Sequence, residues 1–68
     1  MKQVKVAGGM YVDFGGFRFY VLNTALTANT TTVTGAREGD LVKTSHATGR
    51  GSLFRVDSTA KVQFLTNA

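Results

Sequence analysis

The sequence predicts an all-β fold, namely a small antiparallel β-sandwich or barrel of six to seven short strands in a single domain, residues 1–68. Three observations predict it. Short runs of alternating polar and apolar side chains recur along the chain, as expected of strands with one buried face. Turn-forming residues separate these runs roughly every 8–12 residues. β-Branched Thr and Val, which fit a pleated sheet, dominate the middle of the chain.

The first half of the chain predicts three strands: Lys2–Ala7, Met10–Phe14 and Phe17–Leu22. Gly-Gly pairs separate them. The second pair, Gly15-Gly16, joins two alternating runs, and this arrangement predicts a β-hairpin. Asn23–Asn29 is too short to form a helix that is stable alone, so we expect a loop or a bend there.

Alternation assigns the side chains of the third strand to two faces. Phe17, Phe19 and Val21 share one face, and Arg18, Tyr20 and Leu22 share the other. We interpret Phe17 and Phe19 as core residues, because a chain with five Phe cannot easily expose two of them and still fold.

The middle of the chain organises this prediction. Thr30–Thr34 is expected to form a strand that pairs, through a tight polar connection, with a strand that starts at Leu41. The acids Glu38 and Asp40 lie in this connection, where Gly39-Asp40 is typical of a turn. We interpret them as a solvated turn and not as a metal site.

The second half then continues with an exposed polar loop, Lys43–Gly51, and two strands, Ser52–Val56 and Ala60–Leu65. Asp57-Ser58-Thr59 between these strands favours a turn. Three polar side chains of these strands are expected to point to solvent: Arg55, Lys61 and Gln63.

Size and composition limit how this fold is stabilised. A chain of 68 residues buries a thin core. It has no Cys and one His, so disulfides and a thiolate zinc site are excluded, and we expect neither metal nor cofactor. Self-association or docking onto a large partner is therefore the expected source of additional stability. No apolar run is long enough to span a bilayer or resembles a signal peptide, so we expect an intracellular product without membrane contact.

Charge and motifs narrow the function classes. The net charge of +4 indicates an acidic partner, but the basic residues are dispersed along the chain, which argues against nucleic acid. His46 lies beside Ser45 in a loop, and neighbours in a loop do not form a catalytic triad. Gly49-Arg50-Gly51 lacks the spacing of a phosphate-binding P-loop. The sequence therefore predicts a protein without enzymatic activity or catalytic residues.

Two alternatives stay open. Phe17, Phe19, Tyr20 and Arg18 would suit a small β-barrel that stacks the bases of single-stranded nucleic acid on exposed rings. A small adaptor or inhibitor that adds a strand to a host protein would also fit a chain without Pro, because its edge strands lack one common block against pairing.

A longer pattern covers residues Val33 to Asn67. It reads Val33-x-Gly35-Ala36-x-x-Gly39-Asp40-x-Val42, then a variable loop, then Phe54-x-Val56, Val62-x-Phe64 and Asn67. This pattern resembles that of small bacteriophage virion proteins of the head-decoration or cement type, which are head fiber-like. The resemblance implies a β-rich protein that binds the major capsid protein on the capsid surface in many copies, stabilises the shell and associates as trimers. It also implies localisation in the virion after assembly in the host cytoplasm.

Candidate contact residues come from the first strand, the polar loop and the strand after it. They are Val4, Lys5, Lys43, His46, Arg50 and Arg55. The valine belongs to a strand that could pair with the sheet of a neighbour, and the basic side chains suit an acidic shell surface.

Overall fold

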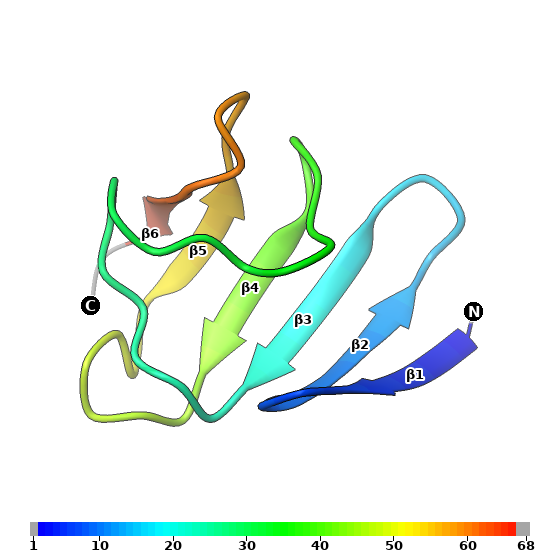
Figure 1. Ribbon diagram of the computed structural model, residues 1–68, viewed down its shortest axis with the longest axis horizontal. Coiled ribbons are helices and arrows are strands. Elements are labelled where there is room, and N and C mark those ends of the chain that lie inside the picture. The colour runs from blue at the N-terminus through cyan, green and yellow to red at the C-terminus, as the bar shows by residue number, and fades with distance from the viewer. Residues whose placement is uncertain (1, 67–68) are drawn as a thin grey trace.

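The computed structural model describes residues 2–66, in which six strands and no helix are present (Figure 1). The strands are β1 (Lys2–Val6), β2 (Gly9–Asp13), β3 (Arg18–Leu22), β4 (Leu41–Thr44), β5 (Leu53–Val56) and β6 (Val62–Thr66). The predicted all-β class is confirmed. Within this described range no helix could cross a membrane. Asn67, the last residue of the phage-like pattern, lies outside it.

The six strands form one mixed sheet in the order β1-β2-β3-β4-β5-β6. All neighbours are antiparallel except β3 and β4, which run parallel. The sheet is strongly twisted and does not close, with β1 and β6 at its two ends (Figure 1). It is therefore a single mixed sheet, whereas an antiparallel sandwich or barrel was expected. A parallel pair needs a connection that crosses the sheet, and residues 23–40 supply it. We call this segment the crossover.

The crossover contains Thr30–Thr34, which is not a strand of the sheet. Only Thr32 forms an isolated bridge, and its partner is Lys61. The amide of Val62 donates to the carbonyl of Thr31 at 3.0 Å, so this part of the crossover follows the outer edge of β6. The predicted pairing of Thr30–Thr34 with the strand at Leu41 is wrong. β-Branched residues favour extended backbone, but they do not choose the partner.

The core lies between one face of the sheet and the crossover. The buried apolar side chains are Tyr20, Leu22, Val42, Phe54, Val56 and Val62 from the strands, with Leu26 and Val33 from the crossover. We call the sheet side that carries these strand residues the covered face. Burying each of these side chains stabilises the fold by about 1.5–3 kcal/mol.

Two aromatic residues predicted as core lie elsewhere. The side chain of Phe17 is 40% exposed, and Phe19 is half-buried on the side opposite Tyr20. Both faces of β3 are apolar, so alternation alone does not identify the buried one. The crossover covers the face of Tyr20 and Leu22, and that contact decides which side becomes the core.

The predicted β2–β3 hairpin is confirmed. The amide of Phe14 donates to the carbonyl of Phe17 at 3.0 Å, and Oδ1 of Asp13 accepts the amide of Gly15 at 2.8 Å. The start of β2 is fixed by a close approach. A Cβ placed on Gly9 would lie 2.1 Å from the carbonyl oxygen of Val21, so only glycine fits there.

The turn at Asp57 is also confirmed, but one of its neighbours differs from expectation. Oδ1 of Asp57 accepts the amides of Thr59 and Lys61 at 2.9 and 3.0 Å. The side-chain amide of Gln63, expected in solvent, donates to Asn29 at 3.0 Å and to Oδ2 of Asp57 at 2.8 Å. The hydroxyl of Thr59 also donates to Oδ1 of Asp57 at 2.7 Å. This bond first, and then the bond from Gln63, hold the pKa of Asp57 well below its usual range.

Asp40 is not the solvated turn residue that the sequence predicts. It is buried, and its two carboxylate oxygens accept the amides of Arg18 and Arg37 at 3.0 and 2.9 Å. A buried carboxylate needs such partners because an unpaired one is costly. Asp40 therefore ties the start of β4 to the start of β3, which holds the parallel pair in register.

Candidate binding surface

The side chains that alternate with the core residues project from the opposite side of the sheet, which we call the outer face. From β1 to β5 these are Gln3, Lys5, Met10, Val12, Phe19, Val21, Leu41, Lys43, Leu53 and Arg55. Three of these residues are basic, none is acidic and six are apolar. One of the six, Val21, is 45% exposed. The crossover lies on the other side of the sheet (Figure 1), so the outer face is free of it.

Strand register arranges the outer face in rows. Lys5, Met10, Val21 and Lys43 are successive cross-strand partners from β1 to β4. In the neighbouring row Leu41 is the partner of Arg55.

Lys43 and Arg55 are therefore diagonal neighbours, with Cα atoms about 7–8 Å apart. Within residues 2–66 neither side chain has an ion-pair or hydrogen-bond partner, and both are exposed. Two like charges repel at this separation unless an anionic group approaches both. We call Lys43 and Arg55 the basic pair of the outer face.

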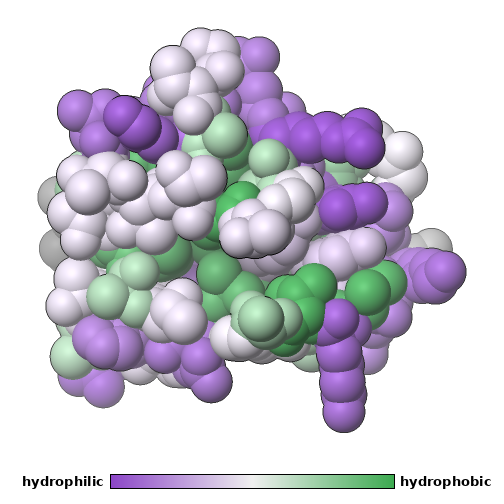
Figure 2. Space-filling model, in the orientation of Figure 1, coloured by the Kyte–Doolittle hydropathy of each residue, from purple (hydrophilic) through white to green (hydrophobic). Residues whose placement is uncertain are grey.

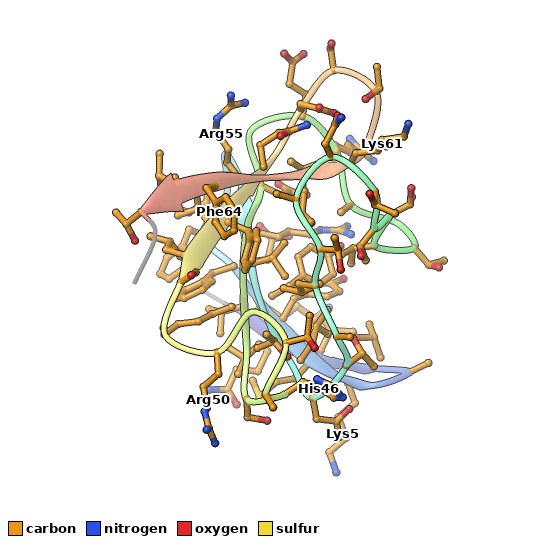
Figure 3. All side chains as sticks on the ribbon, turned by 90° about the vertical axis from the view of Figure 1, so that its left-hand side faces the viewer. Lys5, His46, Arg50, Arg55, Lys61 and Phe64 are labelled. Carbon is orange, nitrogen blue, oxygen red and sulfur yellow. The ribbon has the colours of Figure 1, made fainter. Side chains whose placement is uncertain are left out.

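The six predicted contact residues do not form one site. Lys5, Lys43 and Arg55 share the outer face, whereas Val4 points to the covered side, opposite Tyr11. Figure 3 shows that Lys5 and Arg55 point in different directions, because the sheet twists between β1 and β5.

The remaining two predicted contact residues lie in the loop between β4 and β5, at the lower end of the view in Figure 3. Nδ1 of His46 accepts the amide of Thr48 at 3.0 Å, and the amide of His46 donates to Oγ1 of Thr44 at 3.1 Å. Both bonds are local and shape the loop. Arg50 is exposed further along it.

The four residues of the predicted base-stacking surface are also separated. Tyr20 is 1% exposed in the core, and the guanidinium of Arg18 lies 4.4 Å from the ring centroid of Tyr11. Arg18 also donates to the hydroxyl of Tyr20 at 3.3 Å, and this bond raises the pKa of the guanidinium. Arg18 and Tyr20 therefore face the covered side, and Phe19 faces the outer side.

The structure contains one exposed aromatic pair that is not predicted from the sequence. The rings of Phe14 and Phe17 stack at the tip of the β2–β3 hairpin with centroids 5.1 Å apart, and they are 47% and 40% exposed. The signal was present in the sequence as one Phe on each side of Gly15-Gly16. A two-glycine turn brings such flanking residues into contact across the hairpin.

A hollow of about 460 Å³ lies between the end of β1 and the crossover. Its lining is apolar or threonine: Val6, Ala7, Leu22, Thr24, Leu26, Thr31, Thr32, Val33 and Thr34. Figure 2 shows apolar surface below the crossover on this side of the molecule. The lining has no titratable side chain, so it contains no general acid or base. No group of three or more metal-ligating side chains occurs in the part of the chain that the structure describes.

The residues of the phage-like pattern mostly specify the fold. Gly39 donates its amide to the carbonyl of Val56 at 3.0 Å, and Val42, Phe54 and Val62 are completely buried. Comparisons with known protein families, with curated proteins and with solved structures return no match for this chain. The surface of the molecule therefore carries the functional argument.

Proposed function

We propose that this chain is a non-enzymatic structural protein of a bacteriophage particle. It binds the major capsid protein at the capsid surface in many copies, as a decoration or cement protein, and stabilises the shell. The resemblance of Gly-Ala-x-x-Gly-Asp-x-Val and the strands after it to small virion proteins supports this class. The outer face of the sheet supplies the contact.

The observation that carries the proposal is the basic pair set among apolar side chains. Apolar area removed from water stabilises a complex by about 25 cal/mol per Å² before the costs of association. Lys43 and Arg55 restrict the partner, because an acidic surface relieves their mutual repulsion and a basic surface adds to it. A capsid presents many copies of one such surface in a symmetric array.

Binding also explains how so small a fold is maintained. A ligand that binds only the folded state adds stability that grows with its concentration relative to the dissociation constant. The shell offers its sites at high local concentration. The chain and the shell then stabilise each other, because this coupling is reciprocal.

Cosedimentation with purified capsids that lack this chain tests the proposal. We expect saturable binding at a fixed copy number relative to the major capsid protein, together with a higher melting temperature of the shell. Reversing the basic pair with Lys43→Glu and Arg55→Glu should weaken binding by roughly tenfold or more, because like charges would then face each other.

The matched control carries Arg37→Glu and Arg50→Glu, which change the net charge equally at exposed positions off the outer face. Arg50 is a contact residue predicted from the sequence, so this control also separates the loop after β4 from the outer face as the contact. Capsid binding by this control should stay within about threefold of the original chain. Absence of binding to any capsid, or an equal loss in both double variants, would overturn the proposal. Binding to single-stranded nucleic acid that falls steeply with salt would support the alternative class.

A further inference from the structure

The outer edge of β1 differs from the outer edge of β6. The crossover bonds to β6 through the amide and the carbonyl of Val62, whereas no described segment pairs with the outer edge of β1. We propose that two copies of this chain join through β1, antiparallel, about a twofold axis that passes beside Val4. This inference is independent of the proposed capsid function.

The hairpins show which backbone groups of β1 are free. The amide of Phe14 donates to the carbonyl of Phe17, and the amide of Asn23 donates to the carbonyl of Gly8. Gly8 and Phe14 directly flank β2, so the even-numbered residues of this strand form their backbone hydrogen bonds with β3. Hydrogen-bonded pairs alternate along an antiparallel ladder, so the odd-numbered residues of β2 bond toward β1. Their partners on β1 are Lys2, Val4 and Val6.

The N–H and C=O groups of Gln3 and Lys5 therefore point outward from the sheet. Only registers that pair these residues with each other, or with themselves, satisfy the outward groups of both copies. Pairing Lys5 with Lys5 of the second copy would place two ammonium groups directly opposite. Pairing Gln3 with Gln3 overlaps only the first few residues of the strand.

Pairing Gln3 with Lys5 of the second copy avoids both faults. It overlaps all five residues of β1 and forms two equivalent hydrogen-bonded pairs. Val4 then meets Val4 of the second copy on the axis, as a close pair without hydrogen bonds. Lys2 lies opposite Val6, so no lysine faces a lysine.

Lysine on an edge strand usually prevents association. In β1 repulsion between the two copies of Lys5 excludes one competing register, and the short overlap excludes the other, the pairing of Gln3 with Gln3. Lys5 thus selects the register of the pair and does not prevent pairing.

The twofold axis is perpendicular to the sheet, because antiparallel neighbours in a sheet are related in that way. The pair is then one continuous sheet of twelve strands, twice the six that the described residues of each copy form. The outer faces of both copies lie on the same side. Two basic pairs would therefore approach a partner surface together, which raises the avidity without any new contact.

Cysteine crosslinking tests the register directly, because the chain has no Cys. In the proposed pair the two Val4 Cα atoms are about 4.5 Å apart, within the range for a disulfide, and the two Lys5 Cα atoms are about 8 Å apart, beyond it. We expect Val4→Cys to form a disulfide-linked dimer under mild oxidation and Lys5→Cys to form much less.

Lys5 is more exposed than Val4, so random collisions would give the reverse order. Equal or faster crosslinking of Lys5→Cys would overturn the register. The intact chain should also show a concentration-dependent dimer by sedimentation equilibrium. A monomer at all concentrations up to the millimolar range, or a trimer, would overturn the pairing.

Charge changes at Gln3 test the pairing without crosslinks. Gln3→Glu places two carboxylates opposite two Lys5 side chains, and it should lower the dimer dissociation constant by roughly twofold to thirtyfold. Gln3→Lys should raise it by a similar factor. Ser58→Glu and Ser58→Lys make the same changes in net charge at an exposed turn far from β1. These two control variants should leave the dimer dissociation constant nearly unchanged. The same response at both positions would contradict the proposed contact.

Discussion

The two faces of this sheet use the same kinds of residue and differ in what lies against them. On β3, Tyr20 and Leu22 are buried beneath the crossover, and Val21 between them is 45% exposed on the outer face. Hydrophobicity alone therefore does not define the core of this small fold. The covering segment does, and it is an irregular chain held to β6 by backbone hydrogen bonds.

The outer face keeps its apolar residues although water reaches them. Contiguous exposed apolar surface is uncommon on small soluble proteins and often marks a contact region. On the outer face the apolar surface surrounds the basic pair, Lys43 and Arg55, which has no ion-pair partner within residues 2–66. The contrast implies that substitutions on the covered face should reduce stability, and that equivalent changes on the outer face should alter binding.

The largest loss of stability is expected from a substitution at Gly9 in β2. A Cβ there would lie 2.1 Å from the carbonyl oxygen of Val21 and 2.9 Å from Cα of Leu22, so Gly9→Ala must push β2 away from β3. We expect a loss of about 3 kcal/mol in the free energy of unfolding by urea. Gly16→Ala, with no atom within 4 Å of its added Cβ, is the control and should change stability by less than about 0.5 kcal/mol. Similar losses in both variants would contradict the close approach.

The same side-chain truncation on the two faces measures their difference. Val42 is completely buried on β4, and Val21 is 45% exposed on the neighbouring strand β3. Val42→Ala should reduce the free energy of unfolding by about 2 kcal/mol, because it removes two buried methyl groups and leaves a cavity. Val21→Ala should cost less than about 0.5 kcal/mol. Urea denaturation of both variants at one pH checks this, and equal losses would show that the outer face is also packed.

This contrast also separates what the sequence could predict from what it could not. The β2–β3 hairpin and the turn at Asp57 depend on neighbouring residues, so local patterns predict them. Thr30–Thr34 lies beside β6 because β3 and β4 pair in parallel and the chain between them must cross the sheet. No local pattern specifies the parallel pairing of β3 with β4. The prediction therefore placed Phe17 and Phe19 in the core, whereas the crossover covers the opposite face, which carries Tyr20.

The candidate contact residues show the same limit. Charge and position in exposed segments predict the basic residues among them. Lys5, Lys43 and Arg55 share the outer face only because of strand register, which sequence alone does not supply. Val4 is predicted as part of a strand that pairs at its edge, and β1 lies at the edge of the sheet.

A smaller gain is expected at Ala60, in the turn that leads into β6. Its φ of 65° lies in the left-handed region, which costs an L-residue roughly 1–2 kcal/mol. Glycine adopts this conformation freely but loses more entropy on folding. Ala60→Gly should therefore raise the free energy of unfolding by about 0.5–1 kcal/mol. Ala47→Gly, at an exposed loop position without positive φ, should lower it slightly, and a gain at both positions would show a general effect of glycine.

The smallest expected effect is a fall in the free energy of unfolding at low pH. It arises at the contact between the crossover and β6. The pKa of Asp57 is lowered in the folded chain, chiefly by hydrogen bonds from Thr59 and Gln63. A lowered folded-state pKa contributes stability that is complete above the unfolded pKa, near 3.8, and is lost as the pH falls toward the folded value. The free energy of unfolding should therefore fall between about pH 5 and pH 2, and Asp57→Asn should reduce this slope.

The site of that loss can be located, because Gln63 joins Asp57 to Asn29 of the crossover. Protonation of Asp57 weakens its bond to Gln63 and so loosens the crossover over the covered face. The amide of Val62, which donates to Thr31, should exchange with solvent faster at low pH, after correction for the intrinsic rate. Amides that bond β2 to β3 should show no such change. Uniform acceleration across the sheet would mean that acid acts through net charge, and that Asp57 does not control the contact that separates the two faces.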